Sequence, residues 1–214
     1  MMKKIIFLFI IILTLTQTSS AQLPYTEIKF GYFRPKDTTD GYLFGVHLGR
    51  MIDESLSWGI EINYFRKTYQ ELTKVPDPNP PQQAEPEIVT KQLEFVTQIL
   101  PIWGKLNYEH PIALRSPFFL RASAGIGWEF VWNREDNYGD HISDTRFYNG
   151  FGWQLASGIG MEISSKAVLF LDAFYNSAKV KRGSDNIGGL PTWEELDISG
   201  IGLKVGVSIV GFGW

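Results

Sequence analysis

No cysteine occurs in the chain of 214 residues. This absence excludes disulfide bonds, thiolate metal sites and a cysteine-linked lipid anchor. Histidine is also scarce, with three residues, and the sequence has no established metal or cofactor motif. We therefore expect neither a metal nor a cofactor. The formal net charge of −3 argues against nucleic acid as a partner.

Long hydrophobic runs are missing as well. The one extended apolar run, Ile5–Leu15, is shorter than the roughly 20 residues that a transmembrane helix needs. It follows two lysines and precedes a polar stretch that ends in Ser-Ser-Ala at residues 19–21. This order is typical of a secretory signal peptide. We expect a signal peptide at residues 1–21 and one domain at residues 22–214.

Strict alternation is the clearest pattern that the sequence contains. Over Gly150–Ile163, one phase carries large apolar side chains, whereas the other is mostly glycine and alanine. A period of two residues predicts a β-strand. Its length exceeds the usual strand of about 5–6 residues and suits the roughly 9–11 residues that cross a bilayer. The large phase is expected to face lipid, and the small phase to face a narrow lumen.

Similar alternation predicts eight strands, at residues 26–33, 42–49, 56–64, 88–109, 118–132, 150–163, 169–176 and 200–209. In the fourth of these the apolar phase changes, which a bulge near Val96 to Gln98 would explain. The polar segments 67–87, 134–147 and 183–196 are expected to be exposed loops. The fold class that follows is all-β: an eight-stranded antiparallel up-and-down transmembrane β-barrel.

Connection lengths predict the orientation of the barrel. The longer polar connections lie at one end, and the tighter turns and both termini lie at the other, which in such barrels is the periplasmic end. Aromatic residues of the outward phase gather near the strand ends, as in two interfacial girdles. The outer group is Tyr32, Tyr42, Tyr64, Trp132, Phe151, Trp153 and Tyr175, and the inner group is Trp58, Phe118 and Trp214.

Charged residues of both signs fall on the inward phase. Buried charges need partners, and eight strands enclose room for side chains alone, so we expect a plugged lumen without steady conductance. Glu129 is expected to reach the sixth strand, and Lys204 the surroundings of Glu27 and Lys29. The predicted lumen network comprises Glu27, Lys29, His47, Glu61, Lys105, Glu109, Arg121, Glu129, Glu162, Asp172 and Lys204.

Two alternatives to a membrane barrel remain at this point. The same strands turned inside out would make a soluble, lipocalin-like periplasmic binder of an apolar ligand. A lipid-modifying enzyme would need a nucleophile and a base, for which His141 and Ser143 are the available pair. These residues lie two apart in a polar segment without a nucleophile elbow, so no catalytic site is expected. Nearby acids lack the spacing of a calcium loop, namely Glu135, Asp136, Asp140 and Asp144.

One polar segment is a candidate for contact with an outside partner. Trp193, Glu194 and Glu195 place an aromatic residue beside two acids in the segment 183–196. A partly exposed tryptophan can anchor a protein partner, although it can equally fold back onto the barrel rim.

Three segments resemble a known family: ILPIWGKLNYE at residues 99–109, FFLRASAGIGWEF at 118–130 and GIGLKVGVSIVGFGW at 200–214. They are similar to the outer-membrane β-barrel domain family of Gram-negative bacteria, which includes PorT-like proteins. The resemblance implies an eight-stranded barrel in the outer membrane, surrounded by its lipid. It implies little chemistry, because most members lack an assigned activity.

The chain end resembles the terminal signal by which the barrel-assembly machinery recognises such proteins. Val210, Phe212 and Trp214 would form this signal, with tryptophan in place of the commoner phenylalanine. The expected role is structural, adhesive or assembly-related, exerted through the outer loops on an extracellular or secretion-system protein.

Overall fold

The computed structural model describes residues 23–76, 87–114, 116–137, 142–187 and 190–211. No helix in these ranges is long and apolar enough to cross a membrane. Nearly all of the described chain is strand: β1 (Pro24–Pro35), β2 (Gly41–Met51), β3 (Leu56–Pro76), β4 (Glu87–Pro111), β5 (Phe118–Asn137), β6 (Ile142–Ser164), β7 (Ala167–Ile187), β8 (Leu190–Asp197) and β9 (Gly200–Val210).

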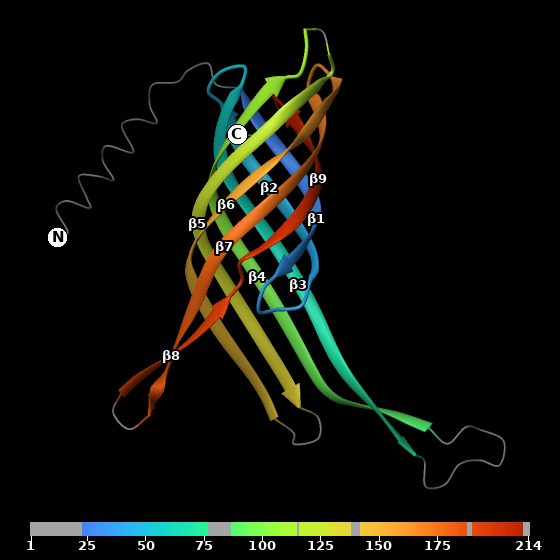
Figure 1. Cartoon of the computed structure of the whole chain (residues 1–214), viewed down its shortest axis with the longest axis vertical. Coiled ribbons are helices and arrows are strands. Elements are labelled where there is room, and N and C mark those ends of the chain that lie inside the picture. The colour runs from blue at the N-terminus through green and yellow to red at the C-terminus, as the bar shows by residue number, and fades with distance from the viewer. Residues whose placement is uncertain (1–22, 77–86, 115, 138–141, 188–189, 212–214) are drawn as a thin grey trace.

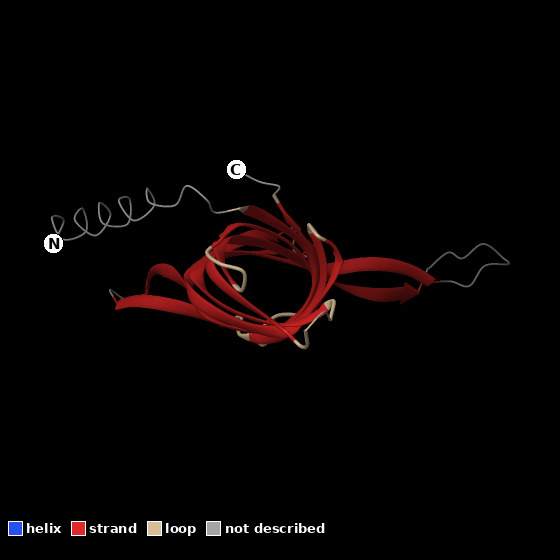
Figure 2. Ribbon diagram, turned by 90° about the horizontal axis from the view of Figure 1, so that it is seen from above, coloured by secondary structure: helices blue, strands red, loops and turns tan. Residues whose placement is uncertain are grey.

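The strands form one closed antiparallel barrel. Neighbours follow the order β6-β5-β4-β3-β2-β1-β9-β7-β8, and a further pairing between β6 and β7 closes the ring. Figure 2 shows this ring from its end. β7 pairs with β9 over Ala167–Asn176 and with β8 over Lys179–Ile187, so β8 and β9 are two parts of one barrel strand. The predicted eight-stranded antiparallel barrel is therefore confirmed.

The predicted loops at 67–87, 134–147 and 183–196 are wrong in most of their length. β3 and β4 remain paired out to Pro76 and Glu87, β5 and β6 out to Asn137 and Ile142, and β7 pairs with β8. These hairpins project from one end of the barrel, opposite to the end where β1 begins and β9 ends (Figure 1). Polar composition indicates exposure to water, but it does not exclude strands. The two strands of a hairpin satisfy each other's backbone hydrogen bonds, so they need no apolar face.

The predicted bulge near Val96 to Gln98 is also wrong. β4 pairs with β5 without a shift from Leu93 to Pro111. Ile99 and Trp103, each 1% exposed, face the lumen on the odd phase. Ile99 belongs to an apolar cluster in the lumen, so apolar residues occur on both phases of this strand.

Pro101 lies beside a break in the ladder between β3 and β4. The register passes from Ile62 opposite Ile102 to Phe65 opposite Ile99, and the residues between them are unpaired in that ladder. Proline has no N–H to donate, so an interrupted ladder is where a strand tolerates it.

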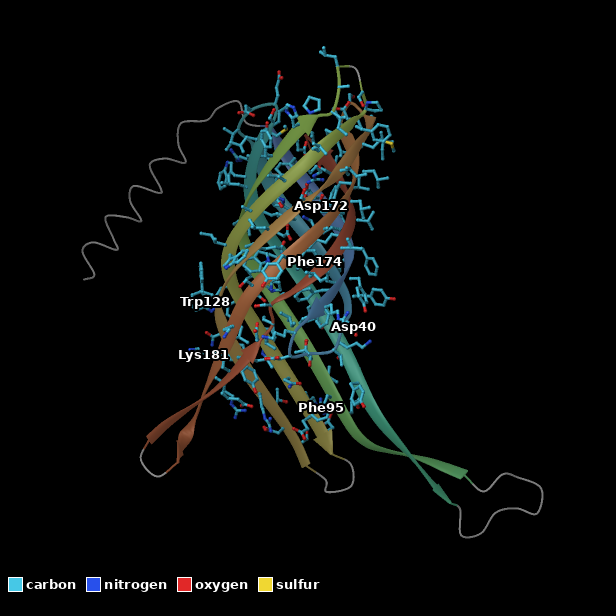
Figure 3. The ribbon with its side chains drawn as sticks, viewed as in Figure 1. Asp40, Phe95, Trp128, Asp172, Phe174 and Lys181 are labelled. Atoms are coloured by element: carbon cyan, nitrogen blue, oxygen red, sulfur yellow. The ribbon has the colours of Figure 1, made fainter. Side chains whose placement is uncertain are left out.

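The outer wall is apolar, as the alternation predicts. Large side chains on the outward phase are about half exposed, from Phe30 at 51% on β1 to Leu203 at 55% on β9. Figure 3 shows Trp128 projecting from this wall. Aromatic residues of the two predicted girdles lie on it, although Trp132 is half-buried and Trp214 lies outside the described residues.

Glycines on the lumen side make room for aromatic rings. A Cβ added at Gly202 would clash with the ring of Phe174, and one at Gly206 would clash with the ring of Phe170. The small residues that the sequence places on the inward phase therefore allow large neighbours to fill the lumen.

Replacing Gly202 with valine is expected to destabilise the barrel by about 1–3 kcal/mol, because the new side chain overpacks the lumen against Phe174. Urea unfolding of the protein in lipid vesicles, followed by tryptophan fluorescence, measures the change. The control is Leu203→Val at the adjacent outward position, which leaves the lumen unchanged. Equal losses for the two variants would contradict the close packing at Gly202.

Candidate functional site

The lumen is filled by two layers of different chemistry. Charged and polar side chains occupy the half nearer the end of the barrel where β1 begins and β9 ends. Apolar side chains occupy the half nearer the projecting hairpins. Asp172 and Phe174 on β7 mark the two layers, with Asp172 nearer the end where β1 begins (Figure 3). Both side chains are buried, each 5% exposed.

Glu61 is the centre of the charged layer. Its carboxylate accepts hydrogen bonds from Lys29 at 2.8 Å, Lys105 at 2.7 Å and Lys204 at 2.9 Å. A fourth donor, the Asn63 amide, lies at 2.8 Å. The three lysines come from β1, β4 and β9, so a single carboxylate joins strands from around the ring.

A second group surrounds Glu27. This carboxylate forms ion pairs with the Arg121 guanidinium and, at 2.8 Å, with the Lys29 ammonium. Arg121 also lies 3.4 Å from Glu109 and 4.0 Å from Asp172, and its guanidinium stacks 3.9 Å from the Phe170 ring centroid.

His47 lies between this group and neutral polar side chains. Its ring is 3.3 Å from Glu27 and 3.1 Å from the Tyr25 hydroxyl, which in turn accepts a 2.6 Å hydrogen bond from Asn107. The predicted lumen network omits Tyr25 and Asn107, because only charged residues on the inward phase were included in it.

The network balances its charges. Four basic side chains and four acidic ones are joined by ion pairs: Lys29, Lys105, Arg121 and Lys204 with Glu27, Glu61, Glu109 and Asp172. This balance is how charges taken out of water are compensated.

Two of the lumen predictions, for Lys204 and Glu162, differ from the structure. Lys204 binds Glu61 and, at 2.7 Å, the amide oxygen of Gln154, rather than the surroundings of Glu27. Glu129 does reach the sixth strand, where a Cβ added at Gly152 would lie 3.0 Å from its Oε1, and it also accepts a 2.8 Å hydrogen bond from Asn176 on β7. Glu162, assigned to the lumen by its phase, is exposed beside a register shift at the end of β6.

An apolar cluster fills the other half of the lumen. The rings of Phe33 and Phe174 lie 5.4 Å apart, and those of Phe33 and Phe65 lie 5.9 Å apart. Ile198, at the junction of β8 and β9, is 0% exposed. The cluster comprises Phe33, Leu43, Phe65, Ile99, Val131, Tyr148, Phe174, Ala178, Val180 and Ile198. The cavity between the two layers measures about 20 Å³, close to the size of one water molecule.

Metal binding does not fit the lumen donors. Glu27, His47 and Glu61 place ligand atoms within 4.8 Å of one another. Both carboxylates are already paired with cations, however: Glu27 with Lys29 and Arg121, and Glu61 with three lysines.

The hairpin end carries a second charged cluster, exposed to water. Glu195 pairs with Lys179 and Lys181, each at 3.2 Å, and these hydrogen bonds hold its pKa below the ordinary value. Glu194 lies 3.8 Å from Arg146 on β6 and so links the β7–β8 hairpin to the β5–β6 hairpin. The side chain of Trp193 lies outside those that the structure describes.

The residues considered for a hydrolase or calcium site form hydrogen bonds and ion pairs within the hairpins, as far as the structure describes them. Ser143 donates a 2.6 Å hydrogen bond to Asp136, which lowers the pKa of that carboxyl together with Arg134. Glu135 and Asp144 both pair with arginine, at Arg146. His141 and Asp140 lie outside the described residues, as do Phe212 and Trp214 of the predicted assembly signal, whereas Val210 ends β9.

A closed barrel with an apolar outer wall and a filled lumen is the class of structure that these residues define. Its solved counterparts are outer-membrane barrels. A neisserial surface protein A structure matches with a TM-score of 0.52 and 13% identity, over 87% of this chain and 96% of that one. A major outer membrane protein from Thermus thermophilus matches with a TM-score of 0.55 and 10% identity, over 87% and 98%.

A third match is the outer membrane protein OprG from Pseudomonas aeruginosa, with a TM-score of 0.51 and 13% identity over 90% and 97% of the two chains. No family model and no curated protein matches the sequence. Identities this low establish a shared fold and leave the activity open.

Proposed function

We propose that the protein is an integral outer-membrane β-barrel with a plugged lumen that acts through its projecting hairpins. The observation that carries this proposal is the distribution of polarity across the barrel wall. Charges are sealed inside, as at Glu61 with 0% exposure, while aliphatic and aromatic side chains cover the outside. Such a wall is stable in contact with lipid, whereas in water a large apolar surface would be exposed to solvent.

The lipocalin-like alternative requires the opposite arrangement. It needs an apolar pocket inside and a charged surface outside. In the described barrel the cavity between the two lumen layers holds about one water molecule, and three lysines converge on Glu61 in the charged layer. A ligand of ordinary size would need a cavity of about 300 Å³ or more.

The hairpins are the surfaces through which a plugged barrel can act. Ion pairs link two of them, through Arg146 and Glu194, and Lys179 and Lys181 stiffen the β7–β8 hairpin through Glu195. A preorganised platform loses less conformational entropy on binding than mobile loops do. This arrangement supports a structural, adhesive or assembly role with an extracellular or secretion-system partner. The Ser143 hydroxyl donates to the Asp136 carboxylate, whose lowered pKa makes it a weak general base, and His141 lies outside the described residues.

The absence of native cysteine allows a direct test of membrane placement. Lys181→Cys, at a hairpin position 58% exposed, is expected to react with a membrane-impermeant maleimide on intact cells. Glu54→Cys, in the exposed turn between β2 and β3, is expected to react after the cells are opened. Recovery of the protein in the soluble periplasmic fraction, or labelling of Glu54→Cys on intact cells, would contradict the proposal.

A further inference from the structure

A long apolar groove crosses the outer wall of the barrel. It has a volume of about 1040 Å³ and touches β4, β5, β6, β7, β9 and β1. Most of its lining residues lie on the outward phase, so the groove faces the surroundings of the barrel and not the lumen. The inward phase contributes five lining residues, namely Asn107, Ser123, Ala156, Phe174 and Gly202.

The floor of the groove follows one row of cross-strand neighbours. Short side chains occupy the middle of this row, and aromatic residues occupy its ends. Five steps between strands, at about 4.8 Å each, give a length of roughly 24 Å. The row runs from β1 to β4 through Tyr32, Leu203, Ala173, Ser157, Ala122 and Tyr108.

Longer side chains stand on both sides of the short ones. Leu171 and Ile159, 48% and 50% exposed, lie two residues along from Ala173 and Ser157 on one side. Leu155, 52% exposed, lies on the other side. The depression is therefore a groove with apolar walls and not a flat part of the surface.

One charged side chain lines the groove, at its hairpin end. Arg34 is exposed on β1, and within the described ranges its guanidinium has no ion pair or hydrogen bond. Three outward carboxylates nearer the hairpins have cationic partners of their own: Asp136 pairs with Arg134, Glu195 with Lys179 and Lys181, and Asp197 with Lys36. An unpaired guanidinium beside an apolar groove matches an anion that carries a hydrocarbon chain.

We propose that this groove binds one phosphate-bearing lipid from the leaflet at the hairpin end of the barrel. The acyl chain lies over Ala173, Ser157 and Ala122, and the phosphate pairs with Arg34. Guanidinium binds phosphate through two parallel hydrogen bonds, and the short side chains let the acyl chain approach the barrel wall. A second copy of the chain is a poorer occupant, because Asp136, Glu195 and Asp197 on its wall are already paired with cations. The inference rests on the membrane placement proposed above.

Native mass spectrometry of the detergent-solubilised full chain tests the proposal, with phosphatidylglycerol and uncharged diacylglycerol of equal chain length as the probes. We expect one phosphatidylglycerol molecule to remain bound in preference to diacylglycerol. Arg34→Gln is expected to weaken its binding by roughly ten- to a hundredfold, because charge-assisted hydrogen bonds to the phosphate are lost. Ser157→Leu, which fills the groove with a side chain suited to lipid, is expected to weaken both lipids alike.

The matched control is Arg66→Gln. Arg66 lies on the outward phase of β3 near the same end of the barrel but does not line the groove. Equal retention of phosphatidylglycerol by Arg34→Gln and the native protein, or equal weakening by Arg66→Gln, would overturn the proposal. So would a groove-filling variant that changes the oligomeric state instead of lipid retention. Because binding is measured in detergent, these outcomes are independent of the cysteine-labelling result for membrane placement.

Discussion

Replacing Glu61 with leucine is expected to lower the free energy of unfolding by about 3–5 kcal/mol, the usual cost of breaking a buried ion pair from one side. Three ammonium groups converge on this carboxylate. Lys29 would keep Glu27, and Lys204 would keep Gln154, but Lys105 would lose its described ion-pair partner. The cost therefore falls mainly on a lysine left buried without a counter-charge.

Urea unfolding in lipid vesicles, followed by tryptophan fluorescence, measures this loss. Glu162→Gln, at an exposed position, is the control and is expected to stay within about 0.5 kcal/mol of the native protein. Adding Lys105→Leu to Glu61→Leu is expected to restore part of the stability, because it removes the uncompensated charge. If the double variant is no more stable than Glu61→Leu, the electrostatic explanation is wrong.

Truncating Phe174 to alanine is expected to cost about 3–5 kcal/mol, because a large buried ring leaves a cavity in the apolar layer. Its side chain is 5% exposed and packs against Phe33, and the Lys204 ammonium lies 4.2 Å from its ring centroid. Phe151→Ala, at an outward position 56% exposed, is the matched aromatic control and is expected to cost less.

The same variant tests the arrangement of the two layers. In planar bilayers, neither the native protein nor Phe174→Ala is expected to carry a steady current, since the charged layer lies in series with the apolar one. A large, stable current through the native protein would contradict the plugged lumen. A current through Phe174→Ala alone would show that the apolar layer makes the seal by itself.

Strand phase was readable from the sequence because alternation depends on local backbone geometry. It placed Glu61, Lys204 and Arg121 on the inward side of their strands, where the structure has them. It did not identify their partners, because those depend on strand stagger and on distances across the lumen. Lys204 and Glu61 are 143 positions apart in the sequence and belong to strands that are not neighbours in the sheet.

The hairpins and the apolar layer were harder to predict for different reasons. Polar sequence beyond residue 66 was interpreted as loop because hydrophobic periodicity disappears where both faces of a hairpin meet water. Predicting the apolar layer requires a second observation besides strand phase. That observation is the presence of aromatic residues on the inward phase, such as Phe65 and Phe174. Ile99 and Trp103 belong to the same inward phase, but the change of apolar phase in their strand predicts a bulge, which hides this signal.

Because Glu61 takes its partners from β1, β4 and β9, the charged layer cannot be completed until the first and last strands have both joined the ring. A partly assembled sheet would present unpaired lysines where the finished barrel hides them. Water must then remain in the open lumen until closure expels it. Completion of the charge network and sealing against lipid are thus one cooperative event, which disfavours a stable open intermediate within the bilayer.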